Sequence, residues 1–141
     1  MKFIILIFTI ISLALCAPDE APSGDQYDTD NLLKVRDCEE EKNLPASEKA
    51  EWWDWKVPAN PTECYIDCIF QKYGWLSGEG GSIVNSAVEA SYAAVGHSNP
   101  SSASCNPSKS GCSKADELYA CLLNADGQKF KDAFDGNRDA K

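Results

Sequence analysis

The chain has 141 residues, enough for one compact domain and too few for two of ordinary size. Its 22 acidic side chains outnumber its 13 Lys and Arg residues, and the formal net charge is -9 at pH 7. Nucleic acid and anionic membranes are therefore poor partners. An acidic surface would attract cationic small molecules or basic proteins, and the alternative is a negative surface that only keeps the protein soluble.

The chain begins with an apolar run over residues 3–15, preceded by Lys2 and followed by Cys16 and Ala17. This pattern is typical of a secretory signal peptide, so we expect residues 1–17 to be removed. The run is too short to cross a bilayer, which needs about 20 apolar residues. Removal of Cys16 would leave six cysteines, an even number suited to disulfides outside the cell.

A flexible acidic segment is expected over residues 18–28, which contain prolines, a glycine and several acids. One domain is then expected over residues 29–141. Its first helix is predicted to begin near Asp28 or Thr29 and to continue to about Lys42, because apolar residues recur there at helical spacing.

A second short helix is predicted over residues 47–55, with the serine as its N-cap. Asn60, Pro61 and Glu63 together form a helix start signal, namely an N-cap, a first-turn proline and an acid at the third position. The third helix is therefore predicted to begin there and to end at Gly74.

Three further helices are predicted in the second half of the chain. Residues 82–95 repeat apolar side chains at helical spacing, which predicts a buried, alanine-rich helix that ends at Gly96. Another helix should begin at Ser113, and the last should carry Phe130 and Phe134 on one face. No strand alternation is present, so the predicted fold class is all-α with about six helices.

Six cysteines in the predicted domain have a spacing that suits a small helical domain cross-linked by three disulfides. They are Cys38, Cys64, Cys68, Cys105, Cys112 and Cys121. Spacing alone leaves fifteen pairings open. A zinc site built from four of these cysteines is disfavoured, because an oxidising compartment would oxidise the thiols first. No metal or other cofactor is expected.

Enzyme activity finds little support in the residues. The single histidine, His97, lies in a loop rich in glycine, serine and proline, where an exposed position is expected. The acids Glu39, Glu40 and Glu41 are consecutive on a predicted helix, so their side chains should point apart and face solvent. No nucleophile motif accompanies them, and we therefore expect a protein that is not an enzyme.

Binding of a small molecule is better supported. Trp52 and Trp55, three residues apart, could share a helix face and line an apolar cavity, with Trp53 beside them. Plain core packing is the alternative for each ring. Three disulfides, each contributing about 2–4 kcal/mol, would help the domain to tolerate such a cavity.

The cysteine spacing over residues 38–121 resembles that of the insect odorant-binding superfamily, whose members are small, secreted, helical carriers. The resemblance implies the pairs Cys38–Cys68, Cys64–Cys112 and Cys105–Cys121. Several strings, CEEEKNLP, WWDW, PTECYIDC, YACLL and FKDAFD, are similar to the salivary D-seven proteins of blood-feeding flies. The chain is similar to a short, single-domain form of these proteins over almost its whole mature length.

This second resemblance implies a secreted, monomeric salivary scavenger of small amphipathic host mediators, which opposes haemostasis and inflammation. The mediators would be lipids, such as leukotrienes and thromboxane analogues, or amines, such as serotonin and histamine. Trp52 and Trp55 match a tryptophan pair of the family's lipid-binding domain, whereas Tyr119 and Asp135 match positions that contact amines. The expected ligand-binding residues are Trp52, Trp55, Tyr65, Tyr119, Phe130, Phe134 and Asp135.

Lipid mediators are slightly favoured over amines, because Tyr65 stands where a histidine is usual and Arg138 where a glutamate is usual. A lipid carboxylate would need a cation such as Lys72, Lys129 or Arg138. Two alternatives stay open. The acidic surface could bind a basic host protein of coagulation or complement, or the protein could carry odorants or pheromones.

Overall fold

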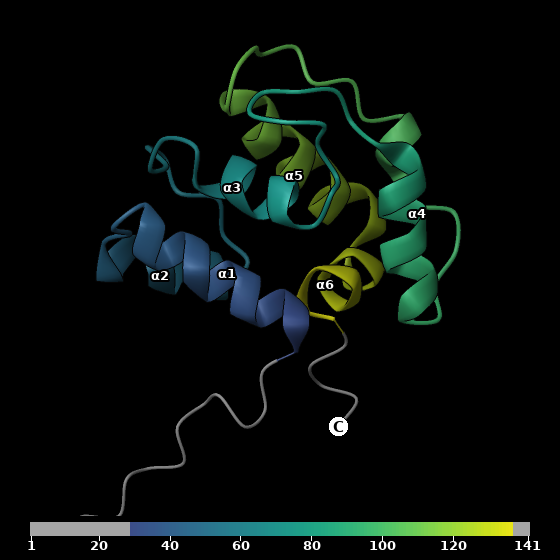
Figure 1. Cartoon of the computed structure of the whole chain (residues 1–141), viewed down its shortest axis with the longest axis horizontal. Coiled ribbons are helices and arrows are strands. Elements are labelled where there is room, and N and C mark those ends of the chain that lie inside the picture. Colours follow the sequence, from purple (N-terminus) through teal and green to yellow (C-terminus); the bar gives the residue numbers. More distant parts are fainter. Residues whose placement is uncertain (1–28, 137–141) are drawn as a thin grey trace, which may run out of the picture.

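The structure, a computed structural model, describes residues 29–136, which form six α-helices and one short 3-10 helix (Figure 1). These elements are α1 (Asp30–Glu41), α2 (Ala46–Trp53), α3 (Tyr65–Lys72), α4 (Asn85–Ala94), η2 (Ser101–Ala103), α5 (Ser113–Asp126) and α6 (Gln128–Asp135). The predicted signal peptide and acidic segment, residues 1–28, and the last residues, 137–141, lie outside the described residues. Within residues 29–136, β-type pairing is limited to an isolated bridge between Leu76 and Ile83. The all-α fold class is confirmed.

Three disulfides cross-link the helices in the pairing that the resemblance implied. They are Cys38–Cys68, Cys64–Cys112 and Cys105–Cys121. The first joins α1 to α3, the second joins the residues that precede α3 and α5, and the third ties the segment after η2 to α5. The loop over residues 106–111 is therefore held at both ends by disulfides.

Helices α3 and α5 pack against each other in the middle of the domain, with α1 against α3 and α6 against α4, α5 and α1 (Figure 1). Their facing side chains form one continuous core. Ile69 and Phe70 of α3 and Leu118 and Leu122 of α5 are fully buried in it. This burial of apolar surface is the main force that holds the helices together.

Hydrogen bonds join the start of α1 to the end of α6. The Thr29 hydroxyl accepts from the backbone N–H of Leu32 at 3.2 Å, which makes Thr29 the N-cap of α1, and the helix begins close to the predicted position. The same hydroxyl donates to the backbone carbonyl of Asp135, and the Asn31 side chain donates to the carbonyl of Ala133 at 2.8 Å. These bonds fix the start of α1 against the end of α6.

The predicted start of the third helix is wrong. Residues 60–63 are not helical, the chain turns at residues 63 and 64, and α3 begins at Tyr65. The reason is a contact with α2: the buried Glu48 carboxylate accepts from the Thr62 backbone N–H at 2.7 Å and from its hydroxyl at 2.6 Å. These bonds satisfy the backbone of the turn where a helix would otherwise begin.

The predicted second and fourth helices are each longer than the observed ones. Helix α2 ends at Trp53, and Trp55 adopts a left-handed backbone conformation with φ of 59°. Helix α4 ends, as predicted, before a left-handed Gly96, but only Val88 and Tyr92 on it are buried, because it lies at the edge of the domain (Figure 1). The expectation of a buried helix is therefore wrong.

Two loops meet closely above α3 and α5 (Figure 1). A Cβ atom on Gly80 would lie 2.7 Å from the Cα atom of Gly111, a distance that only glycine permits without a backbone shift. Lys114 reinforces the contact by donating to the carbonyls of Gly80, at 2.9 Å, and Gly81, at 3.2 Å. The long loop before α5 is thus fastened by backbone contact as well as by disulfides.

Asp116, in the first turn of α5, should make stability depend on pH. Burial, with help from the nearby carboxylates of Asp67 and Glu48, raises its pKa to about 6. Between about pH 4 and pH 6 the Asp116 carboxyl is therefore protonated in the folded protein and ionised in the unfolded chain, so stability falls as pH rises toward 6. We expect Asp116→Asn to stabilise the protein by about 1 kcal/mol near neutral pH, allowing for solvent screening.

Thermal unfolding followed by circular dichroism checks this expectation. The melting temperature of Asp116→Asn should exceed that of the wild type near neutral pH and equal it in acid well below the ordinary aspartate pKa. Glu117→Gln is the matched control, because backbone N–H donors from Lys109 and Ser108 lower the pKa of Glu117. Its replacement should therefore lower the melting temperature near neutral pH, the opposite of the effect at Asp116. An equal shift of Asp116→Asn in acid and at neutral pH would contradict the assignment.

Candidate functional site

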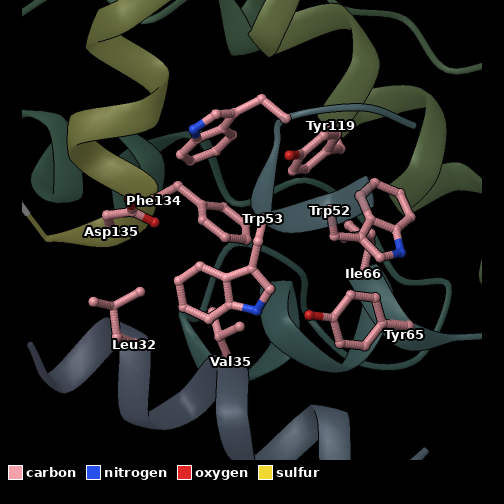
Figure 2. A pocket seen from close by; sticks show the side chains of 10 residues that line it. Leu32, Val35, Trp52, Trp53, Tyr65, Ile66, Tyr119, Phe134 and Asp135 are labelled. Atoms are coloured by element: carbon pink, nitrogen blue, oxygen red, sulfur yellow. The ribbon is translucent and has the colours of Figure 1, made fainter. Parts of the chain in front are cut away.

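A pocket lies where α1, α3, α5 and α6 meet the end of α2 (Figure 2). Aromatic and aliphatic side chains and one carboxylate line it. The lining residues are Leu32, Val35, Trp52, Trp53, Trp55, Tyr65, Ile66, Tyr119, Phe134 and Asp135. The pocket therefore combines a largely apolar wall with a single negative charge.

Six of the seven residues predicted to bind a ligand line this one pocket. The exception is Phe130, whose ring packs 5.1 Å from Tyr119 and 5.6 Å from Phe134, measured between ring centroids, and so lies behind the wall. The role of the six in binding stays a prediction. Their convergence is nevertheless informative, because they come from four different helices and from the residue two positions after α2.

Sequence reasoning missed four lining residues, Leu32, Val35, Trp53 and Ile66. Leu32 and Val35 are three residues apart on α1, so they share its inner face, and both are buried. Their helical spacing could have identified them, because an apolar helix face must pack against the interior of the domain. Trp53 was mentioned beside its neighbours but not assigned to the site.

The aromatic rings of the wall support one another. The centroid of Trp52 lies 5.0 Å from that of Tyr119 in an edge-to-face arrangement and 5.8 Å from that of Tyr65. Trp55 makes a second edge-to-face pair with Phe134 at 5.7 Å. Such pairs stabilise beyond their buried area, so they keep the wall in place. Trp52 and Trp55 thus meet at the pocket although only Trp52 lies in α2.

Asp135 places a carboxylate inside this apolar environment. It is the last residue of α6 and only 6% exposed. Burial, and next the charge of Asp135, raise the pKa of Tyr119, while burial followed by the charge of Glu39 raises the pKa of Tyr65. Both phenols therefore stay neutral at physiological pH and can donate hydrogen bonds to a ligand.

Two buried glutamates hold the tryptophans of α2. Glu39, 6% exposed, accepts from the Trp53 indole at 2.6 Å and pairs with the Lys49 ammonium at 2.6 Å. Glu48 accepts from the Trp52 indole at 3.1 Å. The expectation that Glu39 faces solvent is wrong, because α1 turns this residue toward α2, whereas Glu40 and Glu41 are exposed as expected.

The cations expected near a lipid carboxylate lie elsewhere. Lys72 faces Asp37 at 3.7 Å and Glu41 at 3.6 Å on the outside of α1 and α3, and Lys129 does not line the pocket. Arg138 lies outside the described residues. A different cation is closer, since the Lys131 ammonium lies 5.3 Å from the centroid of the Trp55 ring.

Other candidate residues do not form a second site. His97 is partly buried rather than exposed, and its Nε2 lies 2.7 Å from an Asp132 carboxylate oxygen, away from the pocket lining. Cys64 and Cys112 lie near Glu79, but both are joined in a disulfide and offer no thiolate to a metal. Among the helices of residues 29–136, none has the length and apolarity needed to cross a membrane.

Comparison with known proteins agrees with this architecture. A sequence model of the PBP/GOBP family matches residues 25–125, well over half of the chain. No curated protein and no solved structure matches. The matched range contains the six disulfide-bonded cysteines and every lining residue of the pocket up to Tyr119, and it ends before α6.

Proposed function

The chain belongs to the PBP/GOBP family, the insect odorant-binding superfamily of binding proteins, and we propose that it scavenges a small cationic amine in its aromatic pocket. The three disulfides and the membership of this family both indicate an extracellular protein. The proposed setting is saliva, where the protein would remove host amines such as serotonin or histamine. Removal by binding requires no reaction, so abundance and affinity would set its effect.

The buried Asp135 carboxylate is the observation that carries this proposal. Among the described lining residues it is the one that bears a charge, and none of them is a lysine or arginine. A ligand ammonium would be attracted to this carboxylate, and the aromatic faces of Trp52 and Tyr119 suit a cation further. The charge of the lining thus supports amines ahead of the lipid mediators that the sequence slightly favoured.

A lipid mediator is the second candidate, supported by Lys131. Its ammonium lies over the Trp55 ring at the pocket, so a lipid carboxylate could meet it while the acyl chain contacts the apolar wall. Asp135 would then repel the lipid carboxylate if the two came close. This candidate therefore requires the charged group of the lipid to stay at the rim.

Calorimetric titration of the disulfide-bonded protein tests the proposal. Serotonin and histamine represent the amines, and a cysteinyl leukotriene and a thromboxane analogue represent the lipids. We expect saturable binding of at least one amine and no binding of either lipid. Lipid binding without amine binding would reverse the ranking. If none of the four compounds bound, the result would favour a neutral odorant as the ligand, or a basic protein partner whose binding weakens steeply with salt.

A further inference from the structure

The pocket is almost filled by the protein itself. Its cavity volume is about 20 Å³, which is room for roughly one water molecule. An aromatic amine is many times larger than a water molecule. A lining side chain must therefore leave its position before such a ligand can occupy the pocket.

Eight of the ten lining residues are poorly placed to leave. They lie within helices and are at most 7% exposed. The other two, Trp53 and Trp55, are only partly buried, and they lie where α2 ends and the chain turns. Displacing a partly buried side chain disturbs fewer neighbours than displacing one from the packed interior. Trp53 and Trp55 are therefore the lining side chains that can leave the wall with the least disturbance.

Of the two, Trp53 has the position that a ligand would need. Figure 2 shows its indole in the middle of the pocket, next to Leu32 and Val35, with the Tyr65 hydroxyl pointing toward it. Its Nε1 donates to the Glu39 carboxylate at 2.6 Å. An aromatic ring in an apolar slot, with an N–H on a buried carboxylate, is the arrangement that an indole-type amine would also adopt.

We propose that the Trp53 indole occupies the ligand's place in the free protein, and that an aromatic amine with a ring N–H binds by displacing it and donating to Glu39. The inference rests on the proposed function and narrows its ligand class to indole-type amines. Asp135 would then receive the ammonium and Glu39 the ring N–H. Lys49, paired with Glu39 at 2.6 Å, holds that carboxylate in place when the indole leaves.

Removal of the Trp53 ring should change ligand affinity in opposite directions, depending on whether the ligand displaces this ring or binds against it. If the ligand must expel the indole, only the fraction of molecules with Trp53 outside can bind, and affinity is reduced by that fraction. Trp53→Ala removes this competition, so tryptamine should bind it about tenfold more tightly than it binds the wild type. If Trp53 is instead a wall that contacts the ligand, the same substitution must weaken binding.

Indole N–H spectra of the wild type, recorded by proton–nitrogen NMR with and without saturating tryptamine, test the displacement directly. The Trp53 signal, identified by its absence in Trp53→Phe, should shift and exchange faster with solvent. Trp75 is the internal control, because its indole is fully buried and donates to the Ser91 hydroxyl at 2.8 Å. A Trp53 signal that stays unchanged while tryptamine is bound would overturn the proposal.

Free indole, which has no ammonium, separates this inference from the amine function. Trp53→Ala should bind indole and gain thermal stability from it, whereas the wild type should bind it at least about tenfold more weakly. Suppose that indole binds Trp53→Ala and that tryptamine binds neither protein. This result would refute the amine function and would support a displaceable Trp53. Tighter tryptamine binding by the wild type than by Trp53→Ala would refute displacement. The wild-type spectra decide the matter even if Trp53→Ala does not fold.

Discussion

Asp135→Asn is expected to weaken the binding of tryptamine by about 100-fold or more, because a buried ammonium would lose its charged partner. The amide has the same shape as the carboxylate, and Asp135 joins α1 through its backbone carbonyl, which the substitution leaves intact. Folding should therefore be preserved. Calorimetric titration of the variant and the wild type measures the difference.

Asp132→Asn is the matched control for this experiment. It removes the same charge from the same helix, but Asp132 lies beside His97 and does not line the pocket. We expect its affinity for tryptamine to change by less than about threefold, since solvent screens a charge at that position. Equal losses in the two variants would show a general effect of net charge and would contradict a direct contact with Asp135.

Glu48→Ala is expected to destabilise the protein by about 2–4 kcal/mol, the cost of leaving several buried donors without an acceptor. The Glu48 carboxylate accepts from the Trp52 indole, the Thr62 backbone N–H and the Thr62 hydroxyl. It therefore holds both the pocket wall and the turn that leads to α3. Thermal and urea-induced unfolding, followed by circular dichroism, measures the loss.

Glu48→Gln and Glu51→Ala are the comparison variants for this experiment. The glutamine keeps one acceptor oxygen and should retain part of the stability, whereas Glu51 is an exposed residue of the same helix. Its replacement should change the free energy of unfolding by no more than about 0.5 kcal/mol. A wild-type melting temperature for Glu48→Ala would mean that the three hydrogen bonds contribute nothing measurable.

The fold was predictable from the sequence to the extent that helical periodicity is a local property. The apolar stripe over α1, the start of that helix near Thr29 and the paired phenylalanines of α6 each follow from residues close together in the chain. The start of α3 was not predictable in this way. It depends on Glu48 reaching Thr62, fourteen residues away, and no pattern within residues 60–63 reports that contact.

The pocket was predicted in part, and for a reason that is only half correct. Trp52 and Trp55 were expected to share a helix face, yet both line the pocket because the chain leaves α2 after Trp53 and turns Trp55 back. The central position of Trp53 follows from that turn and from the inward rotation of Glu39. Neither can be read from spacing alone, since both depend on how α1 and α2 pack.

The paired disulfides show a different kind of predictability. Spacing left fifteen pairings open, and the resemblance to the odorant-binding superfamily selected the one that the structure contains. The same resemblance did not decide between lipids and amines. That choice depends on which charged side chains face the cavity, and in residues 29–136 the lining supplies Asp135 and no cation.

The most direct test of the account compares two ligands with the same ring and opposite charges. Tryptamine and indole-3-propionate should be titrated by calorimetry into the wild-type protein under identical conditions. The account predicts that the ammonium ligand binds at least about 100-fold more tightly than the carboxylate ligand. Equal affinity, or tighter binding of the carboxylate ligand, would contradict an amine site at Asp135.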